Sequence, residues 1–590
     1  MANLSQIRRE QMLSFLETLK EQHSDDESLI AINQIERELT AKKYGLVWEE
    51  HEEEVDEKMK THIPVFTEDV SKEIVGNPDS DDFNFLLEGD NLHSLKLLEK
   101  THKGKIGIIY IDPPYNTGKK DFIYGDSYID SNDGYMHSKW VSFMHSRLKI
   151  AHKLLSDDGV IFISIDDNEQ ASLKLLCDEI FNEVNYIGLI AVENNPKGRK
   201  NSNFISVSND YLLIYAKDIT KSSFVENIPK DIKDLAQDEN GNYVHNSGKR
   251  VLVGENDFND NVTDYTSNKH YSIYYNRSSE DFILIKEQEI DKPRTDLLEA
   301  GYERYYSYNS NGFVLNTYTS EKISELFANG ALDFKNGKIY EKNFSTSIRA
   351  KSIWTNRKYQ AVVNNQPVDF QIDLKTTSAK QELKEIFNSK GDVFSNPKNV
   401  GLLKMIITLI ENKDITILDF FAGSGTTGQA VLEQNMIDGG NRHFILCTNN
   451  ENKICEEVTY QRIKTVATGK RANGSIYSDG MPANLKYYKT DFVEKDSEDL
   501  YDDLLEHIVE MIQLQFGVKV DNEKYVIIMD DEEMDEFEKN IVNYDKLEAV
   551  FINQDVLLST SQEKMLEKVN TYIIPDCYFD FELREAGELW

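Results

Sequence analysis

The pattern of apolar and polar positions predicts alternating strands and helices in two separate stretches of the chain. In the first stretch, short apolar runs at 105–111, 159–165 and 210–216 predict strands. Between them, apolar residues recur at helical spacing over 137–155 and 168–181. Continuous apolar strands separated by helices indicate a parallel sheet covered on both faces.

The alternation resumes after a long polar interval. Helices are predicted at 400–410, 425–435 and 456–469, with strands at 414–421 and 442–448. The interval, 219–393, is rich in Asn, Ser and Tyr and lacks this alternation, which indicates an inserted or second domain.

The two ends of the chain have a different character. Residues 1–60 are polar, rich in helix formers and free of proline, which predicts helices. Residues 496–590 are acidic and mix predicted helices with strands. We therefore expect five parts, with boundaries at 1–60, 61–218, 219–393, 394–495 and 496–590.

Composition favours a folded, soluble protein of several domains. The chain has 590 residues, of which 39% are hydrophobic and 11% aromatic. No apolar run is long enough for a membrane span, and the charged N-terminus lacks a signal core, so we expect a cytoplasmic protein with no membrane contact. The four cysteines, Cys177, Cys447, Cys455 and Cys577, are scattered; we expect buried reduced thiols and no metal site.

The net charge of −37 by itself argues against nucleic-acid binding. The acidic residues are unevenly distributed, however: they cluster at 48–59 and 530–540, which we expect to be solvated faces. Basic stretches lie at 194–203 and 348–359. Because binding depends on the local field, DNA remains possible as a ligand.

A glycine-rich turn, LDFFAGSGTTG at 418–428, follows a predicted strand and opens a helix. Glycine lets the backbone turn tightly and approach a ligand, and a helix N-terminus offers free N–H groups. The turn lacks the GxGxxG spacing and a Walker lysine, which favours a cofactor with a carboxylate and a nucleoside over a phosphate cradle. S-adenosylmethionine fits this description; an ordinary strand-to-helix turn is the alternative. The candidate ligands are Asp419, Phe421, Ala422, Gly423, Ser424, Gly425 and Thr426.

Two further strand ends carry polar residues. Asn449 and Glu451 follow the next predicted strand, where doubly wound folds commonly bind ribose hydroxyls, although either residue could equally cap a helix. Asp90 follows the strand that ends at Glu88 and could accept a hydrogen bond from the cofactor's adenine amine. An N-cap for the next helix is an equally good interpretation of Asp90.

The sequence Asp112-Pro113-Pro114-Tyr115 follows directly after the predicted strand that ends at Ile111. Methyl transfer to the exocyclic amine of a base needs acceptors aimed at the amine N–H groups, because the nitrogen lone pair is delocalised into the ring. Asp112 supplies a carboxylate, and the rigid proline turn can present the Pro113 carbonyl. Tyr115 supplies a flat face on which a flipped base can stack.

DPPY followed by a downstream FAGSGTTG resembles the β class of DNA amino-methyltransferases and, more narrowly, the Mod subunit of Type III restriction–modification systems. The resemblance rests also on EGDNLHSL, FSNPKNVGLL and ILCTNNENKICEE, and it extends from residue 86 to the C-terminus. It implies an α/β, Rossmann-like S-adenosylmethionine-dependent core with a circularly permuted, mostly parallel doubly wound sheet. The catalytic half would be 61–218 and the cofactor half 394–495, with a target-recognition domain at 219–393.

The resemblance also assigns individual residues. Asp112, Pro113, Pro114 and Tyr115 match the catalytic motif, and Asn396, Pro397 and Lys398 match a segment that closes over the methionine end of the cofactor. Phe204 and Tyr211 match the region of the flipped-base pocket, although core packing explains either as well. The candidate DNA contacts are Lys197, Arg199, Lys200, Phe204, Arg349, Lys351, Arg357 and Lys358, each of which could instead be an ordinary surface residue.

Several alternatives stay open. Cytosine N4 methylation uses the same amine chemistry, although Asp before Pro-Pro leans toward adenine in the family. A DNA-binding scaffold with a dead site is a different class of function, but the intact Asp112, Gly423 and Gly425 oppose it. The chain has no recognisable helicase or nuclease motif, so the family implies a homodimer on double-stranded DNA with an ATP-dependent restriction (Res) subunit, contacted by the two ends of the chain.

Overall fold

An eleven-stranded sheet forms the body of the protein in the computed structural model. The structure describes residues 4–22, 26–40, 48, 51, 53–78, 80–124, 127–130, 136–198, 204–238, 241–245 and 250–587. The strand order is β1 (His62–Glu68), β27 (Asn484–Glu494), β3 (Asn84–Glu88), β26 (His443–Thr448), β25 (Thr416–Asp419), β4 (Ile106–Ile111), β7 (Leu155–Ile165), β9 (Asp210–Ala216), β8 (Tyr186–Val192) and β22 (Ile353–Trp354), and β2 (Ile74–Val75) pairs with β27.

The centre of this sheet is parallel, from β27 through β3, β26, β25 and β4 to β7. Strand β9 runs antiparallel to both β7 and β8. The connection from β8 to β9 contains no helix among its described residues, and antiparallel neighbours need no helical crossover. The prediction of a mostly parallel sheet is confirmed.

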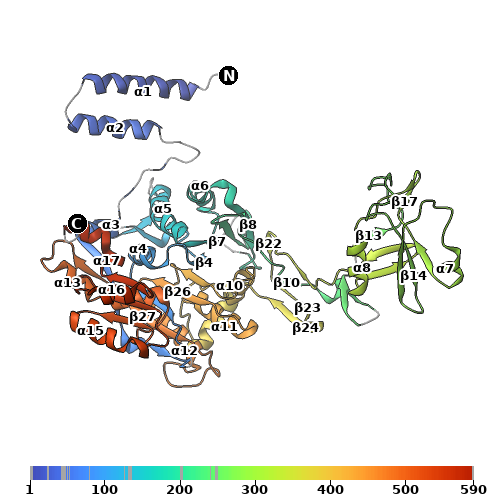
Figure 1. The fold of residues 1–590 in the computed structure, drawn as a ribbon. Helices are drawn as coiled ribbons and strands as arrows, with labels where there is room; N and C mark the ends of the chain where they lie inside the picture. Colours follow the sequence, from blue (N-terminus) through green and yellow to red (C-terminus); the bar gives the residue numbers. More distant parts are fainter. Residues whose placement is uncertain are drawn as a thin grey trace.

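Helices cover both faces of the sheet (Figure 1). One face packs on α4 (Asn91–His102), α5 (Met136–Leu154) and α6 (Gln170–Phe181), and the other on α10 (Val400–Ile407), α11 (Thr426–Asp438) and α12 (Tyr460–Thr468). Strand β4 contributes apolar side chains to both faces of the sheet, because successive side chains of a strand point to opposite faces. Ile109 packs in the core beneath α4, α5 and α6, and Ile108 packs in the core beneath α10, α11 and α12. Both α/β stretches of the sequence thus build one fold.

The order of the strands creates a switch point between β25 and β4. From β25 the chain proceeds through α11 to β26 on one side, and from β4 it proceeds through α5 to β7 on the other. Ligands in such folds bind outside the carboxyl ends of the strands at this point. The glycine-rich turn and the DPPY turn both begin there.

Most of the polar interval forms a small domain at the end of a narrow arm, on the right in Figure 1. Its sheets comprise β13 (Arg250–Val253), β20 (Lys338–Glu341) and β19 (Leu332–Lys335), and β15 (Asp281–Ile285), β14 (Ser272–Asn276) and β16 (Glu303–Tyr305), with helices α7 (Thr295–Glu299) and α8 (Ser320–Ala328). It has a core of its own around Ile273, Ile323 and Leu332. The arm includes β10 (Ile228–Pro229), β21 (Ser347–Ile348), β23 (Arg357–Val363) and β24 (Gln366–Ile372).

The chain begins with a pair of helices, α1 (Leu4–Gln22) and α2 (Asp26–Thr40), joined by an ion pair between Lys20 and Glu36. Helix α3 (Glu54–Thr61) then leads into β1. No helix in the described ranges is long and apolar enough to cross a membrane.

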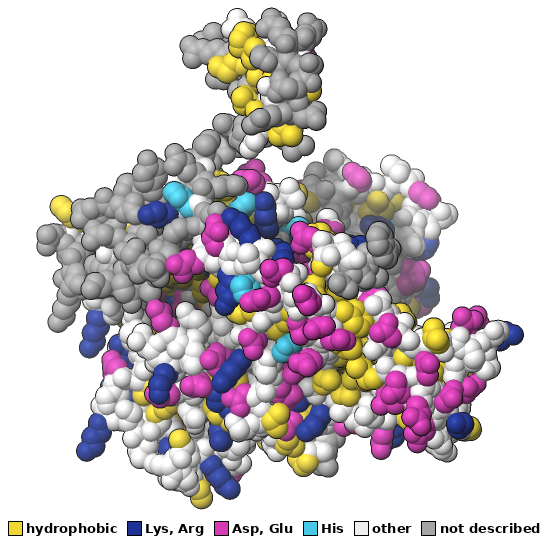
Figure 2. All heavy atoms as spheres, turned by 90° about the vertical axis from the view of Figure 1, so that its left-hand side faces the viewer, with side chains coloured by type: hydrophobic (Ala, Val, Ile, Leu, Met, Phe, Trp, Pro, Cys, Tyr) yellow, Lys and Arg dark blue, Asp and Glu magenta, His cyan; other side chains and the backbone are white. Residues whose placement is uncertain are grey.

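The acidic C-terminal part is a small α/β unit. Its parallel strands are β28 (Tyr525–Ile528), β29 (Ala549–Asn553) and β30 (Asn570–Ile574), accompanied by α15 (Asp531–Asn540), α16 (Thr560–Leu566) and α17 (Asp576–Ala586). The preceding helix α14 (Ile508–Phe516) places Met511 in the core of the main sheet. Acidic side chains are spread widely over the face in Figure 2, as expected for solvated surface.

The cysteines match the prediction in three of four positions. Cys177, Cys447 and Cys455 are buried free thiols. The prediction is wrong for Cys577, which is exposed in the first turn of α17 because the neighbouring Tyr578 and Phe579 supply that helix's contact with the core.

Candidate active site

The DPPY turn is fixed from both sides as it leaves β4. The buried indole of Trp140 donates from Nε1 to the Pro114 carbonyl at 2.7 Å. Asn116, at a φ of 57°, donates from Nδ2 to the Glu169 carboxylate at 2.6 Å, which closes the turn. Because Trp140 engages the Pro114 carbonyl, Pro113 is the proline whose carbonyl fits the predicted role of second acceptor.

A compact cluster of charged and hydroxyl groups surrounds Asp112. The Lys398 ammonium lies 3.0 Å from Asp112 Oδ1 and 3.6 Å from Asp210 Oδ2. Lys398 Nζ also donates to the Tyr115 hydroxyl, which in turn donates to Asp210 Oδ2 at 3.4 Å. Asp210, the first residue of β9, had no signal in the sequence that connected it with the DPPY turn, and Asn194, which donates to its carboxylate, had none either.

The environment shifts the acid–base properties of this cluster. Burial raises the pKa of Asp112, and the Lys398 ammonium opposes that shift. Burial alone would lower the pKa of Lys398, but the Asp112 and Asp210 carboxylates outweigh it and the pKa is raised. The pKa of Tyr115 is raised well above its ordinary value by burial and by the same carboxylates, so its hydroxyl stays neutral.

The glycine-rich turn forms a tight cradle at the end of β25. Gly423 and Gly425 have φ values of 48° and 75°, which side-chain-bearing residues rarely adopt. A Cβ at Gly423 would lie 3.3 Å from the Phe394 ring, and one at Gly425 would lie 3.1 Å from Thr459. The backbone conformation and the neighbouring side chains therefore favour glycine at both positions, while a close approach to a ligand stays a prediction.

Side chains below the cradle hold it in place. The buried Arg462 donates to the Thr426 hydroxyl at 2.8 Å and to the Ser424 carbonyl at 3.2 Å. The Ala422 amide donates to the carbonyl of Cys447 on β26 at 3.1 Å. No motif in the sequence pointed to Arg462, which lies on α12, 36 residues after Thr426.

Asp419 lies buried beneath the same turn. The Phe421 amide donates to Asp419 Oδ1 at 3.0 Å, and the Thr427 hydroxyl donates to Oδ2. Burial raises the pKa of this carboxyl to about 7. The contacts make Asp419 a brace of the turn, while a direct contact with the cofactor remains a prediction.

Asp90 lies at the adjacent end of β3 and caps α4. Its Oδ1 accepts from the Leu92 amide at 2.7 Å and lies 3.3 Å from Arg147, a buried residue of α5. The helix-cap interpretation is confirmed. Since both contacts use Oδ1, Oδ2 is the oxygen suited to the predicted contact with the cofactor's adenine.

The turn after β26 lies beside β3. Asn450 donates to the Glu88 carboxylate at 3.0 Å, and Tyr487 donates to the other oxygen of Glu88. The predicted ribose ligands Asn449 and Glu451 are both exposed next to this pair. Asn396 is also exposed, while Pro397 is buried. The sequence-predicted turns therefore meet at one edge of the sheet.

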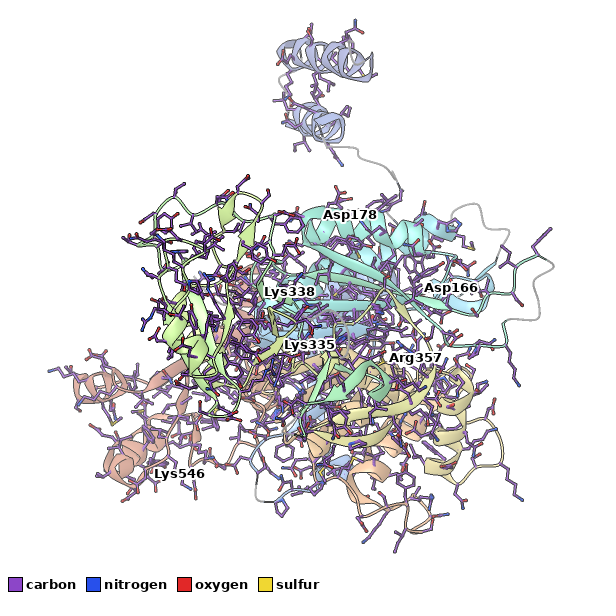
Figure 3. The ribbon with its side chains drawn as sticks, turned by 90° about the vertical axis from the view of Figure 1, so that its right-hand side faces the viewer. Asp166, Asp178, Lys335, Lys338, Arg357 and Lys546 are labelled. Carbon is purple, nitrogen blue, oxygen red and sulfur yellow. The ribbon has the colours of Figure 1, made fainter. Side chains whose placement is uncertain are left out.

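Three of the predicted DNA contacts gather in one pocket on the arm. A cavity of about 710 Å³ is lined by Lys351, Arg357 and Lys358 together with Lys230 and His245, and by two acids, Asp231 and Asp234. Figure 3 labels Arg357 on β23, and Figure 1 shows β23 between the body and the inserted domain. This grouping gives the arm a locally basic wall in an otherwise acidic protein.

The other predicted contacts are dispersed. Arg349 is 86% exposed and lies 3.9 Å from Glu226, and Lys197 is exposed in the connection after β8. Phe204 is 98% exposed, and Tyr211 is half-buried beside Asp167. Arg199 and Lys200 lie outside the described residues.

Residues 106–459 match a family of N6/N4 methyltransferases described as DNA methylase. The chain belongs to this DNA methylase family. The matched segment begins at β4 and ends at Thr459, one residue before α12, so it contains both the DPPY and the FAGSG elements. The family confirms the prediction of an S-adenosylmethionine-dependent, site-specific DNA methyltransferase on an α/β core.

Similar proteins include Type II and Type III enzymes. The Type II methyltransferase M.KpnI of Klebsiella pneumoniae is 34% identical over 69% of this chain and 90% of its own length. The StyLTI Mod subunit of Salmonella typhimurium is 32% identical over 69% of this chain and 60% of its length. The EcoPI Mod subunit of Escherichia phage P1 is 32% identical over 62% of this chain and 58% of its length. The chain thus spans about three fifths of these Mod subunits.

The observed cradle fits S-adenosylmethionine. Gly423 has a positive φ and lies close to the Phe394 ring, so a Cβ at this position would crowd the turn. Acceptors for a nucleoside are present at the adjacent strand ends in Asp90 and Glu88. When bound, the cofactor would supply a methyl group on a sulfonium, whose sulfur leaves readily as a neutral thioether.

Proposed function

We propose that this enzyme methylates the N6 amine of a flipped adenine in a specific DNA sequence, as the Mod subunit of a Type III restriction–modification system. The observation that carries the proposal is the placement of Asp112 at the switch point, next to the strand that bears the glycine cradle. Identity to the Mod subunits and to a Type II methyltransferase supports the same chemistry.

The residues of the catalytic turn have distinct tasks. Asp112 and the Pro113 carbonyl accept hydrogen bonds from the target amine, which favours the pyramidal geometry of a nucleophilic nitrogen. Tyr115 replaces part of the stacking that the base loses on leaving the duplex. The turn can perform this because Trp140 and Glu169 hold it rigidly.

Cytosine N4 methylation is the second candidate, because the family includes both chemistries. Incubation with radiolabelled S-adenosylmethionine and unmethylated bacterial DNA, followed by nucleoside analysis, separates the two. N6-methyladenine supports the proposal, whereas N4-methylcytosine supports the alternative. No transfer, with a Res subunit supplied, would exclude both.

The remaining parts of the chain take their roles from this assignment. We propose that the inserted domain and the basic wall of the arm bind the recognition sequence, since Lys351, Arg357 and Lys358 are suited to phosphate contacts. A salt-sensitive affinity is expected from such contacts. An enzyme that acts without a restriction partner is the alternative for its biological setting.

We also propose a homodimer and a Res partner that contact the ends of the chain. Deleting 496–590 is not a clean test, because the deletion removes α14 and with it Met511 from the main core. The double substitution Glu532→Lys with Glu536→Lys reverses charge on the exposed face of α15 instead. It should reduce co-purification of Res or the mass measured by light scattering.

The matched control, Asp291→Lys with Glu299→Lys, reverses the charge of two exposed acidic residues of the inserted domain. This control should change neither quantity. If the α15 variant behaves like the control, the contact lies elsewhere on the chain.

A further inference from the structure

The ammonium of Lys398 lies where a donor is needed next to the catalytic carboxylate. Its nitrogen is 3.0 Å from Asp112 Oδ1, within the range at which an amine N–H donates to a carboxylate. The side chains of Lys398 and Asp112 are 19% and 25% exposed, so the pair is largely enclosed, and Asp112 Oδ1 itself is buried. The ammonium lies against Oδ1, so a target amine that donates to this oxygen has to displace it.

We propose that Lys398 is a positioning residue of the target pocket, which holds the Asp112 carboxylate in its productive orientation while no base is bound and yields that place to the target amine. This inference rests on the proposed function, because it takes Asp112 as the acceptor for the amine.

The surroundings allow the ammonium to move without moving the backbone. The Lys398 carbonyl accepts from the Thr426 hydroxyl at 3.3 Å, and the next residue, Asn399, caps α10 through the Gly401 amide at 2.8 Å. The backbone is thus tied to α10 and to the first residue of α11, while the side chain has four flexible methylenes. A change of rotamer is sufficient for displacement.

Asp210 provides the second position for the ammonium. It already lies 3.6 Å from Lys398 Nζ and also accepts from Asn194 and Tyr115. A displaced Lys398 can therefore close on Asp210 as the base enters. The positive charge stays in the pocket, and neither carboxylate is left without a cation nearby.

The charge of Lys398 affects the pKa of Asp112, and this effect can be measured. The titratable groups that face Asp112 are Lys398, Asp210, Tyr110, Tyr115 and Asp419. Both tyrosines have raised pKa values and stay neutral, so Lys398 is the cation of this set. Without it, Asp112 faces two further carboxyl groups and no cation, and like charges raise the pKa of a carboxyl group.

The test compares two single variants, Lys398→Met and Lys398→Arg, with the double variant that combines Lys398→Met and Asp210→Asn. Initial rates of radiolabel transfer to unmethylated bacterial DNA are measured from about pH 4 to 9, because the acid limb of such a profile reports the carboxylate that must be ionised. We expect Lys398→Met to move that limb to higher pH by about one unit or more. Lys398→Arg should keep the wild-type limb, and Asp210→Asn in the Lys398→Met background should move it back.

Calorimetry with S-adenosylmethionine alone gives the second readout. We expect Lys398→Met to bind the cofactor with wild-type affinity, because the ammonium contacts the target side of the site. An unshifted pH profile, or a tenfold or greater loss of cofactor affinity without a shift, would overturn the inference and assign Lys398 to the cofactor. Absence of transfer by the wild-type enzyme would instead count against the proposed function.

Discussion

Replacing Gly423 with alanine tests the cradle more directly than removing any side chain. The residue has a φ of 48°, and its new Cβ would lie 3.3 Å from the Phe394 ring. A non-glycine residue in the left-handed region costs about 1–3 kcal/mol, and the ring must also shift by a few tenths of an ångström. If the turn relaxes to avoid this cost, cofactor affinity falls by about 5- to 150-fold, since each 1.4 kcal/mol is a factor of ten.

The glycine that ends α11 supplies the matched control. Gly439 has a φ of 64°, and a Cβ there would meet no atom within 4 Å. Gly439→Ala carries a similar backbone penalty away from the site, so it should lower the melting temperature and leave cofactor affinity unchanged. Isothermal calorimetry with S-adenosylmethionine measures both variants. Equal losses of affinity, or no loss in Gly423→Ala, would refute the assignment of the cradle.

Three further predictions concern single side chains of the site. Asp112→Ala should abolish methyl transfer and keep cofactor binding in the same calorimetric assay, because Asp112 serves the target amine; a loss of cofactor binding would mean that its role is misplaced. Tyr115→Ala should cost about 1–3 kcal/mol in kcat/KM from lost stacking, and Tyr115→Phe should cost less, which steady-state kinetics on DNA decides. The native state holds the proton of Asp419 more tightly than the unfolded chain, because its pKa of about 7 exceeds the ordinary value of 3.8. Stability should therefore decline as pH rises through this window, and Asp419→Asn should remove that part of the decline in thermal melts.

Local sequence patterns were sufficient for the turns of the site. The strand before Asp112, the proline turn and the glycine-rich turn after Asp419 are all contiguous motifs, and the structure places them at neighbouring strand ends. The helices and strands of the α/β stretches follow from periodicity, because each buries a regular stripe of apolar residues.

The partners of those turns could not be read from the sequence. Asp210 and Lys398 meet Asp112 only because β9 reverses direction beside β7 and because the segment before α10 returns to the switch point. Likewise, Trp140 and Arg147 reach Pro114 and Asp90 from α5, through contacts that depend on helix rotation in the folded state. Such long-range pairings leave no periodic signal in the chain.

Single-molecule sequencing of genomic DNA from a host that expresses this protein identifies the methylated base and its sequence context in one experiment. We expect N6-methyladenine at one specific sequence motif, present with the wild-type enzyme and absent with Asp112→Ala. Methylation of cytosine N4, methylation that persists in the Asp112→Ala variant, or DNA without modification would contradict it.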